Sequence, residues 1–172
     1  MDKKGRVNLA PFSYFNALSA DPPMVVFGPN AKNDQEAKDS YRNVLEVPEF
    51  VVNIVSTELK EQMIATSEPV DHGINEMELA GLSAAKSTNV APPRIAEARA
   101  ALECVVYKTG DFPPGHDGRI GHFVMGQVVG IHIDDSVIRD SKVDETLLRQ
   151  ISRLGYFNYN EVKDVFVMKR PT

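Results

Sequence analysis

The sequence predicts a mostly antiparallel β-barrel with a few short helices around it. Five to seven segments have the β-branched and aromatic composition of strands, and three or four short segments have helical periodicity. Strands and helices do not alternate regularly, as they would in a parallel α/β sheet. The strand expected at residues 122–134 is about thirteen residues long, and a strand of that length bends when it belongs to a small barrel.

The first strand is expected at residues 11–20, where aromatic side chains precede a proline-rich turn. A short apolar strand follows at residues 24–28, and the polar stretch at residues 28–39 is expected to be a loop. A helix should begin at Asp39 or Ser40 and end at Glu46, two residues before a proline.

The middle of the chain combines strands and short helices. Residues 49–56 and 99–110 are rich in β-branched and apolar side chains, as buried strands are, while residues 57–65 and 75–82 have helical spacing. Cys104 is the only cysteine, so no internal disulfide can form. We expect a small buried core residue there rather than a reactive thiol.

In the long strand at residues 122–134, one face is apolar and the opposite face carries Gly126 and Gly130. Glycines at such positions permit the bending that barrel closure requires. The apolar face comprises Phe123, Met125, Val129, Ile131 and Ile133.

Residues 144–155 have the clearest helical pattern, with Asp144 as its cap and Gly155 at the left-handed position after its end. Residues 164–169 are strand-like. No long Gly/Ser or Pro linker interrupts the chain, so residues 1–172 are expected to form a single domain.

The charge balance narrows the class of partner. A net charge of -5 and a pI near 5.4 argue against nucleic acid or an anionic membrane and favour a small molecule or a protein. The N-terminal residues lack the apolar core of a signal peptide, and no run approaches about 18 apolar residues. The expected compartment is the cytoplasm.

Several common sites are excluded by the motifs. The sequence contains no G-x-G-x-x-G, no P-loop and no G-x-S-x-G. Its four histidines have no metal-binding spacing, and His122 and His132 would lie roughly 33 Å apart on one strand, at about 3.3 Å per residue. No metal site is expected.

An anion site is possible at the start of the helix near residue 39. Lys38, the Ser40 hydroxyl and Arg42 surround free backbone N–H groups there, which favours a phosphate. Asp39 opposes an anion electrostatically and is expected to cap the helix. A solvated helix start with an ordinary cap explains the same residues.

The first strand could line a pocket for a flat heterocycle. Ser13, Asn16 and Ser19 interleave with aromatic and aliphatic residues, and a planar ring needs apolar walls with a few donors and acceptors at its edge. An ordinary barrel strand with its polar atoms facing water would give the same pattern.

Taken together, six segments resemble the flavin reductase-like family, whose fold is the FMN-binding split barrel. They are NLAPFSYFNALSADPPMVVFG, KDSYRN, EFVVNIVS, APPRIAEARAALEC, GHFVMGQVVGIHID and RLGYFNY, in family order over residues 8–159. The resemblance implies a mainly β, antiparallel Greek-key barrel with peripheral helices. It also implies a homodimer that binds FMN non-covalently.

The resemblance assigns roles to individual positions. It implies that Asn16, Ala17 and Ser19 edge the isoalloxazine and the ribityl chain. The phosphate end would be held by Lys38, Asp39 and Ser40, with Arg42 and Asn43.

Two further positions match the family and have alternatives. Asn53 matches a position near the flavin, although a strand Asn satisfied by backbone is equally consistent. His122 loosely matches a histidine near the nicotinamide in related reductases, and it is a candidate for a catalytic or NAD(P)H-contacting role. A structural imidazole is the alternative.

The function expected from the resemblance is that of an FMN-dependent oxidoreductase that takes hydride from NADH or NADPH and reduces flavin or another acceptor. The cofactor would carry the hydride chemistry, which fits a sequence with no obvious catalytic dyad. The alternative is a non-enzymatic flavin carrier or electron-transfer protein.

Overall fold

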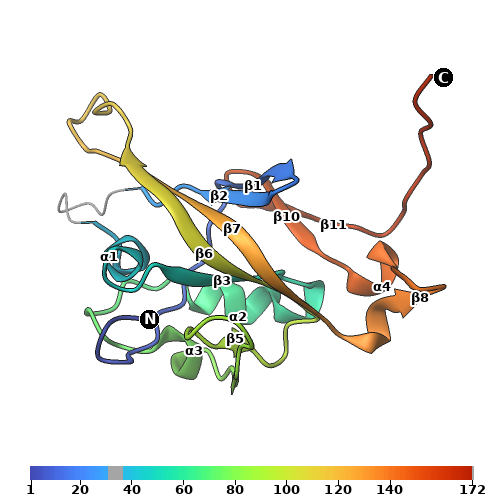
Figure 1. Cartoon of the computed structure of the whole chain (residues 1–172), viewed down its shortest axis with the longest axis horizontal. Helices are drawn as coiled ribbons and strands as arrows, with labels where there is room; N and C mark the ends of the chain where they lie inside the picture. Colours follow the sequence, from blue (N-terminus) through green and yellow to red (C-terminus); the bar gives the residue numbers. More distant parts are fainter. Residues whose placement is uncertain (31–36, 172) are drawn as a thin grey trace.

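A curved five-stranded antiparallel sheet forms the centre of the protein (Figure 1). The computed structural model describes residues 1–30 and 37–171. The strands lie in the order β1-β2-β7-β6-β3, so β1 and β3 are the two edges of the sheet. Their bounds are β1 (Phe15–Ala20), β2 (Pro23–Phe27), β7 (His122–Ile133), β6 (Ala100–Asp111) and β3 (Glu49–Asn53). The predicted mainly β antiparallel fold is confirmed.

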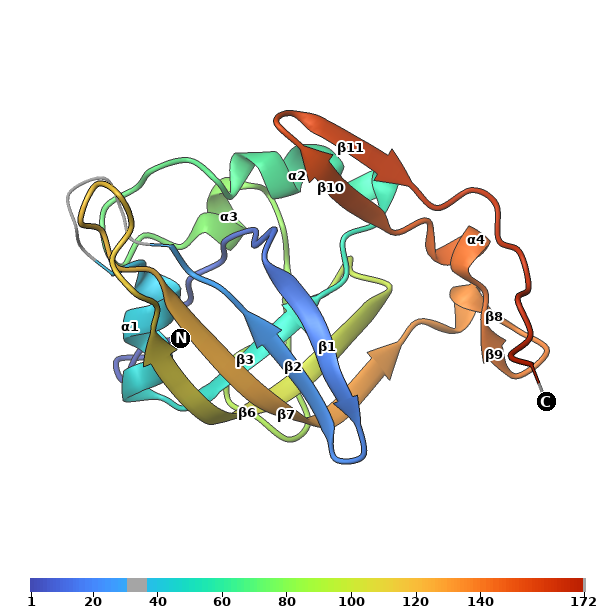
Figure 2. The ribbon, with the colours of Figure 1, turned by 90° about the horizontal axis from the view of Figure 1, so that it is seen from above.

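Short helices surround this sheet, and a separate hairpin lies beside it (Figure 2). The helices are α1 (Asp39–Glu46), η1 (Thr57–Leu59), α2 (Lys60–Ala65), α3 (Glu76–Leu79), η2 (Asp135–Val137) and α4 (Glu145–Leu148). The remaining strands are β4 (Ala84–Ala85), β5 (Arg94–Ile95), β8 (Ile138–Arg139), β9 (Lys142–Val143), β10 (Ile151–Gly155) and β11 (Asn158–Glu161). None of the helices in the described ranges is long and apolar enough to span a bilayer.

The main core lies between the sheet and α1. It contains Phe27 and Phe50 from two strands, Tyr41 from α1, and Cys104, whose exposed fraction is 0% as predicted for a buried thiol. The glycine-bearing face of β7 is the buried one, because Gly126 leaves room for the ring of Phe50.

The apolar face of β7 points outward in its central part. Ile131 is 65% exposed and Val129 is 40% exposed, and on the neighbouring strand Tyr107 is 70% exposed. The sheet therefore presents apolar side chains on the face opposite its core.

The helix predicted at residues 144–155 is wrong beyond its first turn. Asp144 caps α4 as expected, accepting hydrogen bonds from the N–H groups of Thr146 and Leu147. Arg149 then adopts a left-handed conformation, and the Ile151 N–H donates to the carbonyl of Val55. Pairing with β11 makes the rest a strand, so Gly155 lies within β10 and ends no helix.

Three other predictions need correction or lie partly outside the description. Residues 164–169 form no strand, and the structure pairs them with no described strand. Lys38, and not Asp39, occupies the cap position of α1, and Asp39 is the first helical residue. Within the loop predicted at residues 28–39, residues 31–36 lie outside the described part of the chain.

Candidate flavin site

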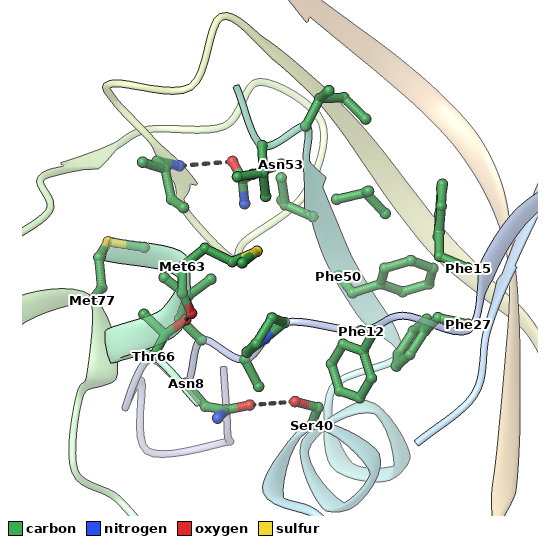
Figure 3. A pocket seen from close by; sticks show the side chains of 18 of the residues that line it. Asn8, Phe12, Phe15, Phe27, Ser40, Phe50, Asn53, Met63, Thr66 and Met77 are labelled. Carbon is green, nitrogen blue, oxygen red and sulfur yellow. Dashed lines mark hydrogen bonds between the residues drawn. The ribbon is translucent and has the colours of Figure 1, made fainter. Parts of the chain in front are cut away.

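A cavity of about 610 Å³ is lined by residues of both edge strands of the sheet, β1 and β3. Its walls come from the segment before β1, from α1 and α2, and from strands β3 and β10. Figure 3 shows aromatic side chains at one end and methionines at the other. Segments from both halves of the chain thus build one cavity.

Packed phenylalanines form the aromatic end. The rings of Phe12 and Phe27 have centroids 4.9 Å apart, and those of Phe27 and Phe50 are 5.1 Å apart at an edge-on angle of 65°. Phe27 and Phe50 belong to the main core, and all three line the cavity. This wall is therefore apolar and held in place by core packing.

A hydrogen-bonded chain fixes the N-terminal segment against α1 and α3. The Ser40 hydroxyl donates to Asn8 Oδ1 at 2.8 Å, and Asn8 Nδ2 donates to Glu76 Oε1 at 3.0 Å. The buried Glu76 carboxylate also accepts from the N–H of Leu9. The Ser40 side chain is thus already engaged, which leaves its backbone N–H as the group suited to an anion.

Two asparagines also line this cavity. Asn53 Oδ1 accepts a hydrogen bond from the backbone N–H of Ile95 at 2.9 Å. The backbone therefore orients this amide, which agrees with the alternative interpretation of Asn53 as a strand residue satisfied by backbone. Asn43, on α1, is 4% exposed. Both residues add polar groups to a cavity whose lining is mostly apolar.

The beginning of α1 is rich in charged groups. Lys38 Nζ lies 5.5 Å from the ring centroid of Phe12, so the ammonium sits beside the aromatic wall. Asp39 Oδ1 lies 3.0 Å from His72 Nδ1 and 3.8 Å from Arg42 Nη1. Asp39 is therefore turned toward the imidazole of His72 and the guanidinium of Arg42.

The β1 residues are exposed along the whole strand. Asn16 lines a second cavity of about 540 Å³, which shares Ser13, Phe15 and Phe27 with the first. Ala17 and Ser19 line neither of these two cavities. The start of β1 therefore separates the two spaces.

His122 lies at the start of β7 and lines neither cavity. Its Nδ1 is 2.7 Å from Asp111 Oδ1, and its ring stacks on that of Tyr41. Burial and the Asp111 carboxylate raise the pKa of Tyr41 above its ordinary value. The imidazole is thus held by protein groups on its face and on its edge.

The structure brings together some of the predicted residues and not others. Ser40, Asn43 and Asn53 share the large cavity, while Asn16 faces the second one. Lys38, Asp39 and Arg42 lie on the same helix start without lining either cavity. No group of three His, Cys, Asp or Glu within residues 1–30 and 37–171 is placed to hold a metal ion.

The aromatic wall and the N-terminal segment of the cavity were not predicted from the sequence. Phe12 and Phe50 were assigned only to strands, although a phenylalanine at a strand edge is also suited to a ring-binding wall. Asn8 has no local signal at all, because its partner Glu76 is 68 residues away.

These features define a flavoprotein-type split barrel, and comparison with known proteins gives the family. The chain belongs to the family described as flavin reductase like domain, whose model matches residues 2–159. The resemblance inferred from the sequence motifs is confirmed.

Relatives are similar over nearly the whole chain. An uncharacterized protein of Aquifex aeolicus is 37% identical over 90% of this chain and 76% of its own length. A Halalkalibacterium halodurans protein, also uncharacterized, is 37% identical over 99% of this chain and 81% of its own length.

Two solved structures share both the fold and 30% of the sequence. Nitrilotriacetate monooxygenase component B from Bacillus cereus has a TM-score of 0.89, covering 96% of this chain and 82% of that one. The Pseudomonas fluorescens 2-nitrobenzoate 2-nitroreductase has a TM-score of 0.85, covering 100% of this chain and 81% of that one.

Proposed function

We propose that this protein is an FMN-binding oxidoreductase of the flavin reductase type, which takes hydride from NADH or NADPH and passes electrons to flavin or another acceptor. The observation that carries the proposal is the cavity beside the start of α1, with a phenylalanine wall and amide side chains. The two solved relatives at 30% identity, named as a monooxygenase component and a nitroreductase, support an oxidoreductase.

The cavity suits FMN in size and in chemistry. Its volume of about 610 Å³ lies within the range of about 300–1,000 Å³ that is typical of cofactor sites. Phe12 and Phe50 give apolar surface for a tricyclic ring, and Asn43 and Asn53 give donors and acceptors for its polar edge. The helix start and Lys38 give positive charge for a phosphate.

The roles of the residues follow from these positions. When bound, the flavin supplies the hydride-accepting group, and the chain need only orient it and shield it from water. The phenylalanine wall would shield one side of the bound ring from water. Asn53, oriented by Ile95, would hold the ring edge, and Lys38 with the first N–H groups of α1 would hold the phosphate.

Spectroscopy tests the proposal directly. The purified protein is titrated with FMN and then mixed with NADH or NADPH under nitrogen in a stopped-flow instrument. We expect saturable FMN binding, followed by bleaching of the bound flavin within seconds. Binding without bleaching by either nucleotide would identify a flavin carrier or electron-transfer protein, and the lack of any binding would refute the flavin site.

Replacing Lys38 tests the phosphate end of the site. Lys38→Ala should weaken FMN binding about tenfold and leave riboflavin binding unchanged, because riboflavin lacks the phosphate that the ammonium would contact. Fluorescence quenching titrations give both dissociation constants. Lys142→Ala, on β9, is the matched control and should match the wild type. Equal affinity of Lys38→Ala and wild type for FMN would place the phosphate elsewhere.

A further inference from the structure

Three side chains form a tight cluster where the long hairpin meets α1. The rings of His122 and Tyr41 are stacked, with centroids 4.0 Å apart and planes 6° from parallel. His122 Nδ1 lies 2.7 Å from Asp111 Oδ1, and the Tyr41 hydroxyl donates to the same oxygen at 3.4 Å. Asp111 and His122 face each other as the last register pair of β6 and β7.

The cluster fixes the imidazole on its face and on its edge. The side chain of His122 is only 14% exposed, and its backbone N–H donates to the carbonyl of Pro29 at 3.0 Å. Stacking of two rings and a hydrogen bond to a carboxylate both resist displacement. A ring held in this way can fix the positions of the residues that it contacts, and it is poorly suited to moving with a substrate.

Tyr41 connects this cluster to the start of α1. It is the third residue of the helix and is buried in the main core, directly after Asp39 and Ser40. A shift of the Tyr41 ring therefore moves the first turn of the helix. Displacements of about 1 Å are sufficient to impair a binding site.

We infer that His122 is a positioning residue, which acts through Tyr41 to locate the first turn of α1 and so the phosphate end of the FMN site. This inference rests on the proposed function, since FMN is the ligand whose phosphate would contact that turn. It assigns to His122 a role in cofactor affinity and none in hydride transfer.

Flavin affinities test the role of His122. His122→Ala should weaken FMN binding about fivefold to tenfold, from the lost stacking and the lost charge-assisted bond, and should leave riboflavin binding unchanged. His122→Asn, which can keep the contact with Asp111, should recover part of the loss. His132→Ala, at the other end of the same strand, is the matched control and should bind both flavins like the wild type.

Other outcomes overturn the inference. Unchanged FMN affinity with slower bleaching by NADH or NADPH would show that His122 serves hydride transfer. Equal losses for FMN and riboflavin would show that it has no specific effect on the phosphate end.

If the wild type binds neither flavin, the proposed function fails, and the inference is then tested by NMR without ligand. Amide shifts at residues 38–40 should then change in His122→Ala and not in His132→Ala, and unchanged shifts would refute it.

Discussion

At Gly126, the Phe50 ring from β3 packs so close to the backbone of β7 that an added Cβ would lie 2.5 Å from the ring. Gly126→Ala should therefore lower the free energy of unfolding by about 1–3 kcal/mol, because the core would be overpacked. Urea denaturation measures the loss. Gly155→Ala is the control, since nothing lies within 4 Å of a Cβ added there. Equal unfolding midpoints for the two variants would contradict the close packing at Gly126.

Glu103 is a buried carboxylate, 3% exposed, that ties β6 to the segment before β5. It accepts backbone hydrogen bonds from Thr88 at 2.9 Å and from Asn89 at 2.6 Å. Burial alone would raise the pKa of Glu103, but these N–H groups hold it below its ordinary value of 4.5. The ionised form is thus favoured in the folded state.

Glu103→Gln should cost about 1–3 kcal/mol of stability at neutral pH, because the amide presents a donor to one of the two N–H groups. Since the folded pKa is depressed, the contribution of Glu103 is complete above about pH 4.5 and is lost as pH falls through the folded pKa. The stability gap between wild type and variant should therefore narrow in acid. Urea titrations at pH 7 and pH 3 measure it, and a gap that widens in acid would disprove this account.

At the scale of the elements, local signals located the strands of the central sheet and the starts of α1 and α4, but they missed β10, β11 and the end of α4. Asp144 caps α4 through groups within three residues, so sequence alone revealed it. The end of α4 depends on Arg149, which bonds to Glu58 at a separation of 91 residues and to Glu161 at 12. The pattern of apolar residues within 144–155 cannot reveal these contacts with distant residues.

In the candidate site, too, some features could be predicted from the sequence and others could not. Ser40, Asn43 and Asn53 were predicted because motifs place them, and the structure puts all three on one cavity. The outward direction of the apolar face of β7 could not be predicted, because alternation fixes which residues share a face and not which face is buried. The glycine-bearing face of β7 is the buried one here because the Phe50 ring fills the space beside Gly126.

At the scale of the whole molecule, the outward apolar side chains of β6 and β7 form an exposed face that an interface would bury. We propose a homodimer in which a second copy covers this face, which includes Tyr107, Val129 and Ile131. Ile131→Lys should then shift the protein from dimer to monomer, as measured by light scattering after size-exclusion chromatography. Leu79→Lys, on α3 and equally 65% exposed, should stay dimeric. A monomeric wild type, or a dimeric Ile131→Lys variant, would count against this interface.

The cavity of the candidate site takes its walls from the N-terminal segment, α1, β3 and β10, which are spread over most of the chain. A chain emerging from the ribosome can therefore offer a complete binding space only after residue 159 has been made and has docked. A molecule that binds in this cavity therefore binds only the folded protein. Its concentration in the cell would then raise the stability of the folded state and lower the fraction of copies that are unfolded.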